Sequence, residues 1–216
     1  MARKRKRNYH ELHLNELAPD FEVATISGVI RLSDYRGRWV VLFSHPADFT
    51  PVCTSEIVRL AELYQQFRAL NCEIIGLSVD SQYTHVAWLD AIRKSCGIKV
   101  PFPIIDDQGR KIANKYGMIH PDSSTTCTVR STFIIDDEGR LRMLQHYPIW
   151  VGRSLDEILR VLQAAQTSDR EGVALPESWH PGDAAVDLPA EPLAASKNSL
   201  SEWFSSIKKD VFARHH

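Results

Sequence analysis

Short runs of apolar, β-favouring residues recur along the chain and predict a sheet. The run at residues 39–44 reads Trp-Val-Val-Leu-Phe-Ser and indicates a buried strand. Similar runs predict further strands at residues 73–79, 102–106, 131–136 and 140–146. The last two are joined by Asp137-Glu138-Gly139, which is typical of a turn between antiparallel strands.

Apolar residues at helical spacing lie between these strands. One face carrying Ile57, Leu60, Ala61, Tyr64 and Phe67 predicts a helix over residues 51–70. Further helices are predicted at residues 84–94 and 111–116. The sequence Ser154-Leu155-Asp156-Glu157 is a capping box and predicts the start of a last helix. Its apolar face carries Ile158, Leu159, Leu162 and Ala165.

This order of strands and helices predicts an α/β protein with a thioredoxin-like fold, in which a mixed sheet has helices on both faces. We expect a basic tail at residues 1–10, a thioredoxin-like domain at residues 11–168 and a C-terminal extension at residues 169–216. Four prolines punctuate the extension: Pro176, Pro181, Pro189 and Pro192. We interpret it as an extended arm that lies across its own domain or a second subunit, with a short helix at residues 200–211.

Composition and charge exclude several classes of protein. The 216 residues carry 26 basic and 27 acidic side chains, so the net charge of -1 gives no overall bias toward nucleic acid or anionic membranes. Residues 3–7 form a basic run, which we interpret as a solvated tail, with a nucleic-acid or anionic-surface contact as the alternative. No apolar run reaches the roughly 18 residues of a membrane span, and no secretory signal is present. We therefore expect a cytoplasmic protein that does not bind membranes.

The four cysteines are Cys53, Cys72, Cys96 and Cys127. No C-x-x-C pair occurs among them, so the sequence predicts neither a structural zinc site nor a local dithiol. A reducing compartment favours free thiols. We interpret Cys72 as a core residue and Cys96 as a residue at a helix end. Whether Cys127, in a polar segment before Arg130, takes part in redox chemistry stays open.

Cys53 has the placement of a reactive cysteine. It follows the strand at residues 39–44, where Thr50 suits the N-cap of the next helix and Pro51 suits its first position. The sulfur then lies near unpaired backbone N–H groups and the positive end of the helix dipole. A helix end supplies only about 0.3 to 1 kcal/mol, so a nearby cation must contribute most of the stabilisation of a thiolate. Arginine is the natural candidate.

The sequence around Cys53 resembles a known enzyme family. Residues 46–53 read Pro-Ala-Asp-Phe-Thr-Pro-Val-Cys and match the P-x-x-x-T-x-x-C signature of peroxiredoxins. The sequence from Ser44 to Cys53 is most similar to the one-cysteine, peroxiredoxin 6-like subgroup of this family, and the length of the chain is similar to that of its long-tailed members. The resemblance covers roughly residues 14–189 and includes Arg130-Ser131-Thr132-Phe133 and Gly152-Arg153.

The resemblance implies a role for each matching residue. Cys53 would be the peroxidatic nucleophile, Thr50 and Pro46 would shape its pocket, and Arg130 would be the activating guanidinium. Three supporting residues would be Glu56, which orients arginine, His45, which lies close to the pocket, and Arg153, a second nearby cation. No cofactor and no metal is implied, and the family suggests a homodimer and a ring of dimers.

The expected activity is that of a thiol-dependent peroxidase, which reduces hydrogen peroxide or a small organic hydroperoxide and leaves a sulfenic acid on Cys53. No cysteine follows Cys127, and residues 200–206 carry serines where some long-tailed relatives have resolving cysteines. We therefore expect an external thiol, such as glutathione or a thioredoxin-type protein, to resolve the sulfenic acid. The alternatives are a thioredoxin-like disulfide exchanger and an oligomeric redox sensor or holdase. The chain lacks a G-x-S-x-G setting, so lipase activity is not predicted.

Overall fold

The computed structural model describes residues 11–26 and 28–187, which fall into two compact units divided between Leu155 and Asp156. The first unit is an α/β domain built on one mixed sheet of seven strands in the order β2-β1-β5-β4-β3-β6-β7. The bounds of its strands are β1 Glu22–Thr25, β2 Gly28–Arg31, β3 Trp39–Ser44, β4 Cys72–Ser78, β5 Ile104–Asp106, β6 Arg130–Ile135 and β7 Leu141–Tyr147. Its helices are η1 Leu32–Tyr35, a 3-10 turn, and the α-helices α1 Pro51–Ala69, α2 Gln82–Cys96 and α3 Lys111–Lys115.

The sheet is parallel at its centre and antiparallel at its edges. β3 pairs with β4 and β4 with β5 in parallel, each connected by a helix, as expected of crossover connections. β6 and β7 then add antiparallel strands beside β3, and β1 and β2 add an antiparallel hairpin beside β5. The predicted mixed sheet and thioredoxin-like fold are confirmed.

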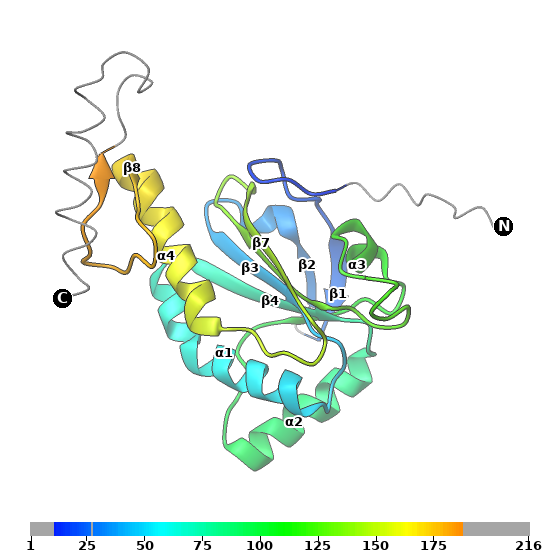
Figure 1. The fold of residues 1–216 in the computed structure, drawn as a ribbon. Coiled ribbons are helices and arrows are strands. Elements are labelled where there is room, and N and C mark those ends of the chain that lie inside the picture. Colours follow the sequence, from blue (N-terminus) through cyan, green and yellow to red (C-terminus); the bar gives the residue numbers. More distant parts are fainter. Residues whose placement is uncertain (1–10, 27, 188–216) are drawn as a thin grey trace. The chain divides into compact units, whose positions relative to one another are not determined.

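Every residue of β3 is buried, which explains its apolar composition. Val40 and Leu42 join a core cluster that also holds Ile112 and Tyr116, from α3 and the residue that follows it. The alternate residues Val41 and Phe43 point to the other face of the sheet. Figure 1 shows α1 and α2 on one side of the sheet and α3 on the other. Two helical layers therefore enclose the central strands, as the sequence predicted.

Local signals set the ends of the helices. Pro51 occupies the first turn of α1, as predicted, and Asn71 turns the chain with a φ of 50° before β4. Ser81 caps α2 by accepting a hydrogen bond from the Thr84 backbone N–H, and Gly97 ends it in the left-handed conformation at φ 71°. These caps extend α2 by two residues at each end beyond the predicted 84–94.

The hairpin of β1 and β2 was not predicted. Both strands are four residues long, and three residues of β2 are exposed, so neither shows an extended apolar run. The turn at Thr25 is closed by a hydrogen bond from its hydroxyl to the Gly28 carbonyl. The sequences of such short strands carry little alternation of apolar and polar residues. Their conformation depends mainly on pairing with neighbouring strands, so it is hard to predict from sequence.

The second unit contains the helix α4 Leu155–Glu171 except for its first residue, which ends the first unit, and a small pair of strands, β8 Val173–Ala174 and β9 Val186–Asp187. Within this unit Arg160 donates to the Trp179 carbonyl, and the Trp179 indole donates to the Asp183 carbonyl. The predicted boundary at 168–169 lies inside α4, and the three-part division stays a prediction. The predicted tail at 1–10 and helix at 200–211 lie outside the described residues. None of the helices described is both long and apolar enough to cross a membrane.

Candidate active site

Cys53 lies in the first turn of α1 and is fully buried, with 0% of its surface exposed. The segment 45–50 connects β3 to this helix. Thr50 is the N-cap residue, as predicted, with an extended backbone at φ -97°. Its hydroxyl, however, donates to the Ala47 carbonyl at 2.9 Å and does not cap the helix. The first N–H groups of α1 therefore lack a capping hydroxyl, and they lie beside the Cys53 sulfur by helix geometry.

Arg130 is the residue that contacts the Cys53 sulfur. It is the first residue of β6, and the antiparallel pairing of β6 with β3 brings it to the start of α1. Its Nη1 lies 3.3 Å from Cys53 Sγ and donates to Glu56 Oε2 at 2.7 Å. Its Nε donates to the Ile149 carbonyl at 2.8 Å. With a side chain only 2% exposed, the guanidinium is fixed at both ends and aimed at the sulfur.

Glu56 joins Arg130 to a second arginine. Arg153 donates its backbone N–H and Nε to Glu56 Oε1 at 2.8 and 3.0 Å, and its Nη2 to Oε2 at 2.7 Å. The Arg153 Nη1 donates to the Ser131 carbonyl at 2.9 Å. Two guanidiniums and one carboxylate leave one formal positive charge in this buried cluster, and a thiolate on Cys53 would neutralise it. The cluster therefore places a net positive charge against the buried sulfur.

The environment of Glu56 also has a measurable consequence. Burial alone would raise the pKa of Glu56, but the hydrogen bonds and charge of Arg153, together with the charge of Arg130, bring this pKa below its ordinary value of 4.5. A carboxylate with a lowered folded-state pKa stabilises the fold above the pKa of the unfolded chain. That contribution is lost as the pH falls through the folded-state pKa.

We expect Glu56→Gln to lower the free energy of unfolding by about 3 to 5 kcal/mol near neutral pH, because two buried guanidiniums lose their counter-charge. Urea unfolding at a series of pH values measures this, and the difference from wild type should shrink as the pH falls below 4.5. Glu62→Gln on the exposed side of the same helix is the control, since the Glu62 side chain is 47% exposed where it pairs with Arg59. Equal losses for both variants would contradict a buried ion cluster.

Two other residues predicted for the site, His45 and Pro46, are buried in the 45–50 segment. The Nε2 of His45 is hydrogen-bonded to Asp48 Oδ1 at 2.8 Å, and its Nδ1 is the one buried side-chain polar atom without a partner among the described residues. The structure thus brings Cys53, Arg130, Glu56 and Arg153 into one network and places His45 in a second. The sequence did not predict that the Ile149 carbonyl accepts a hydrogen bond from Arg130, because a backbone acceptor leaves no signal in the sequence.

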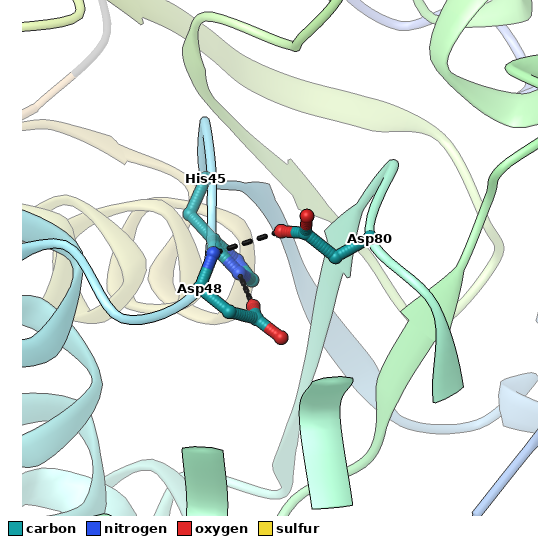
Figure 2. A group of neighbouring side chains, drawn as sticks. All are labelled: His45, Asp48 and Asp80. Carbon is teal, nitrogen blue, oxygen red and sulfur yellow. Dashed lines mark hydrogen bonds and ion pairs between the residues drawn. The ribbon is translucent and has the colours of Figure 1, made fainter. Parts of the chain in front are cut away.

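His45, Asp48 and Asp80 form the group within residues 11–26 and 28–187 whose donor atoms have the spacing of a metal site, lying within 4.8 Å of one another. All three side chains already make hydrogen bonds inside the protein. His45 pairs with Asp48, and Asp80 accepts from the Asp48 backbone N–H at 2.8 Å and from the Ser78 hydroxyl at 3.1 Å. Figure 2 shows the His45 ring beside the Asp48 carboxylate and the Asp80 carboxylate directed at the Asp48 backbone nitrogen. We interpret the group as a hydrogen-bonded cluster.

The remaining cysteines differ from Cys53 in their surroundings. Burial raises the pKa of the Cys72 thiol to about 12, which fits the predicted core role. Cys96 is exposed at the end of α2. Cys127 is half-buried, with its sulfur 3.1 Å from the Ser124 hydroxyl. Of the four, Cys53 is the one for which the structure records a contact with a guanidinium.

A cavity of about 670 Å³ lies away from Cys53. Its lining comes from the start of the described chain, the segment after α3, and β7, and includes Leu12, Tyr116, His120, Asp122, Leu144 and His146. None of the residues that the sequence predicted for the site lines it. The chemistry at Cys53 therefore belongs to the compact polar cluster at the start of α1 and not to this cavity.

Comparison with known proteins points to one family. The model of the AhpC/TSA family matches residues 14–144. A peroxiredoxin of Aquifex aeolicus is 53% identical over 169 residues, which cover 78% of this chain and 76% of the relative. A crystal structure of a cysteine-to-serine mutant of peroxiredoxin 6 from Arenicola marina has a TM-score of 0.79 and 33% identity, over 93% of this chain and 89% of its own. A structure of yeast mitochondrial 1-Cys peroxiredoxin has a TM-score of 0.79 and 36% identity, over 93% of this chain and 92% of the yeast chain.

Proposed function

The chain belongs to the AhpC/TSA family and is a peroxiredoxin, a thiol-dependent peroxidase, and on that premise we propose that Cys53 is its peroxidatic cysteine and that an external thiol restores it. The observation that carries the proposal is the Arg130 Nη1 at 3.3 Å from the buried Cys53 sulfur. A guanidinium at that distance stabilises a thiolate on Cys53 electrostatically. It can also stabilise the negative charge that develops on a peroxide oxygen during the reaction.

In the proposed reaction the Cys53 thiolate attacks one oxygen of a hydroperoxide. The O–O bond breaks, the attacked oxygen stays on sulfur as the sulfenic acid, and the second oxygen leaves as hydroxide or alkoxide and takes up a proton. Sulfur is oxidised by two electrons and the peroxide is reduced by two. Negative charge grows on the departing oxygen, where Arg130 and the backbone N–H groups of the first turn of α1 are placed to stabilise it.

Thr50 and Pro46 complete the proposed pocket. The Thr50 hydroxyl now donates to the Ala47 carbonyl, so it must exchange that acceptor for a peroxide oxygen in order to take part. Pro46 has no N–H and is buried beside His45, which suits a wall that excludes water. Arg153 and Glu56 act through Arg130, because Glu56 bonds both guanidiniums and so fixes the one that contacts the sulfur.

We further propose that the sulfenic acid is resolved by an external thiol. The thiol attacks the Cys53 sulfur, water leaves, and a mixed disulfide remains; a second thiol then releases Cys53 and a disulfide. The similar yeast protein is described as resolved through glutathione and thioredoxin systems, which supports this route. A homodimer, a ring of dimers and a cytoplasmic location are proposed from the family resemblance.

Treatment of the reduced protein with one equivalent of peroxide, with no reductant present, tests the proposal. We expect intact mass to rise by one oxygen, and peptide mapping to place that oxygen on Cys53, because the structure has Cys53 as a free thiol that forms no disulfide. Addition of glutathione should then give a mixed disulfide at Cys53. Loss of two hydrogens in place of the added oxygen would contradict the one-cysteine cycle and would identify an internal partner such as Cys127.

A further inference from the structure

The burial of Cys53 creates a requirement that the proposed cycle must meet. Peroxide is small, but an external thiol carries a larger group and has to bring its sulfur to within bonding distance of an atom that is 0% exposed. The part of the chain that covers the sulfur must therefore move aside after the sulfenic acid forms, and the segment 45–50, which leads directly into the first turn of α1, is the candidate for this movement. The contacts that hold this segment in place then govern how often the sulfur becomes accessible.

Asp48 is the centre of those contacts. Its Oδ1 pairs with the Nε2 of His45 at 2.8 Å, and its Oδ2 pairs with the Nδ1 of His85 at 2.7 Å. Its backbone N–H donates to Asp80 Oδ2 at 2.8 Å (Figure 2). One residue of the segment is thus tied to α2 through His85 and to the β4–α2 connection through Asp80. The side chains of Asp48, His45 and His85 are at most 1% exposed, so water does not compete for these bonds.

The charges in this cluster make the bonds strong. The hydrogen bonds from both histidines lower the pKa of Asp48 against the opposing effect of burial, so Asp48 is ionised. The pKa of His85 is raised, because its bond to Asp48 outweighs burial, whereas burial lowers the pKa of His45 and keeps that ring neutral. Hydrogen bonds to an ionised group are roughly twice as strong as neutral ones. Asp48 therefore accepts from the Nε2–H of His45 and from His85.

A second tie from α2 reaches the same region. The Trp88 indole donates to the Thr54 hydroxyl at 3.2 Å, and the Thr54 hydroxyl donates to the Thr50 carbonyl at 2.8 Å. The Trp88 ring also lies 5.2 Å from the ring of His45, centre to centre. α2 thus holds the chain on both sides of Thr50, through His85 before it and through Trp88 after it.

We propose that Asp48 is a positioning residue that holds the 45–50 segment closed over Cys53 and so sets the rate at which an external thiol reaches the Cys53 sulfenic acid. The inference rests on the proposed one-cysteine cycle. Closure keeps the thiolate beside Arg130 for the reaction with peroxide, and opening admits the reductant. The two half-reactions therefore need opposite states of this segment, and Asp48 sets the balance between them.

Asp48→Asn tests this, because asparagine keeps the shape but has one acceptor oxygen, which cannot serve both histidines. We expect the reaction of the preformed sulfenic acid with glutathione to become roughly ten- to a hundredfold faster, the ratio that corresponds to loss of a hydrogen bond to a charged group. The reaction of reduced protein with peroxide should become slower. Both rates are measured separately by stopped-flow mixing with the full chain.

Asp90→Asn makes the same substitution on the exposed side of α2 and is the matched control. His85→Leu removes one of the two bonds to Asp48, and should shift both rates in the same directions by a smaller factor even if Asp48→Asn fails to fold. A merely structural role would slow both half-reactions together, and that result, or an unchanged glutathione rate, would overturn the proposal. Failure of the wild-type protein to form a sulfenic acid would instead overturn the proposed function.

Discussion

Peroxide consumption by a Cys53→Ser protein, supplied with dithiothreitol, is expected to fall to the rate of buffer and dithiothreitol alone. Serine replaces sulfur by a hydroxyl that stays protonated at neutral pH and is a far weaker nucleophile toward a peroxide oxygen. The cluster of Arg130, Glu56 and Arg153 would remain, so the variant removes the reacting atom and leaves its surroundings.

Three controls separate this loss from damage to the fold. Cys96→Ser and Cys127→Ser should consume peroxide at the wild-type rate, because within residues 11–26 and 28–187 the structure records no contact between either sulfur and a guanidinium. Cys72→Ala tests the thiol whose pKa burial raises to about 12, and it should retain activity with some loss of stability. A Cys53→Ser protein that keeps wild-type turnover, or a Cys127→Ser protein that loses it, would contradict the assignment.

The central fold could be predicted because its elements have strong local signals. The fully buried β3 required an apolar run, and Thr50 with Pro51 marked the start of α1, which fixed the place of Cys53. The hairpin of β1 and β2 lacked such a signal, since its short strands are held mainly by pairing. The same reasoning correctly placed Thr50 at the N-cap. It did not predict that the Thr50 hydroxyl donates to the Ala47 carbonyl and does not cap the helix.

The charged cluster could not be assembled from local pattern. Arg130 and Arg153 lie 74 and 97 positions from Glu56 along the chain, and at the level of sequence only the family resemblance connected the three residues. The pattern of residues around each arginine is that of an ordinary strand or helix flank. Asp48 illustrates the same limit, because its partner His85 lies 37 positions away, and nothing in either local sequence reveals that the two share a hydrogen bond.

Arg130 is expected to give the second large effect. Arg130→Met should lower kcat/KM for hydrogen peroxide by about a hundred- to a thousandfold, the range for removal of one donor that stabilises a developing oxyanion. The guanidinium performs two tasks, because its Nη1 reaches both the sulfur and Glu56, and its Nε is held by the Ile149 carbonyl. Methionine has no donor for either task, although its unbranched side chain fills a similar space.

Arg130→Lys distinguishes charge from geometry. Lysine restores one positive charge, but its ammonium is a point charge on a flexible chain and cannot bond the Ile149 carbonyl and Glu56 while it faces the sulfur. We therefore expect kcat/KM for hydrogen peroxide in Arg130→Lys to lie between the values of Arg130→Met and the wild type. The rate of iodoacetamide labelling at Cys53 should also lie between the rates of those two proteins. Arg140→Met, at a side chain 47% exposed, is the matched control and should behave as wild type. Full activity in Arg130→Lys would show that charge alone suffices, and full activity in Arg130→Met would remove Arg130 from the mechanism.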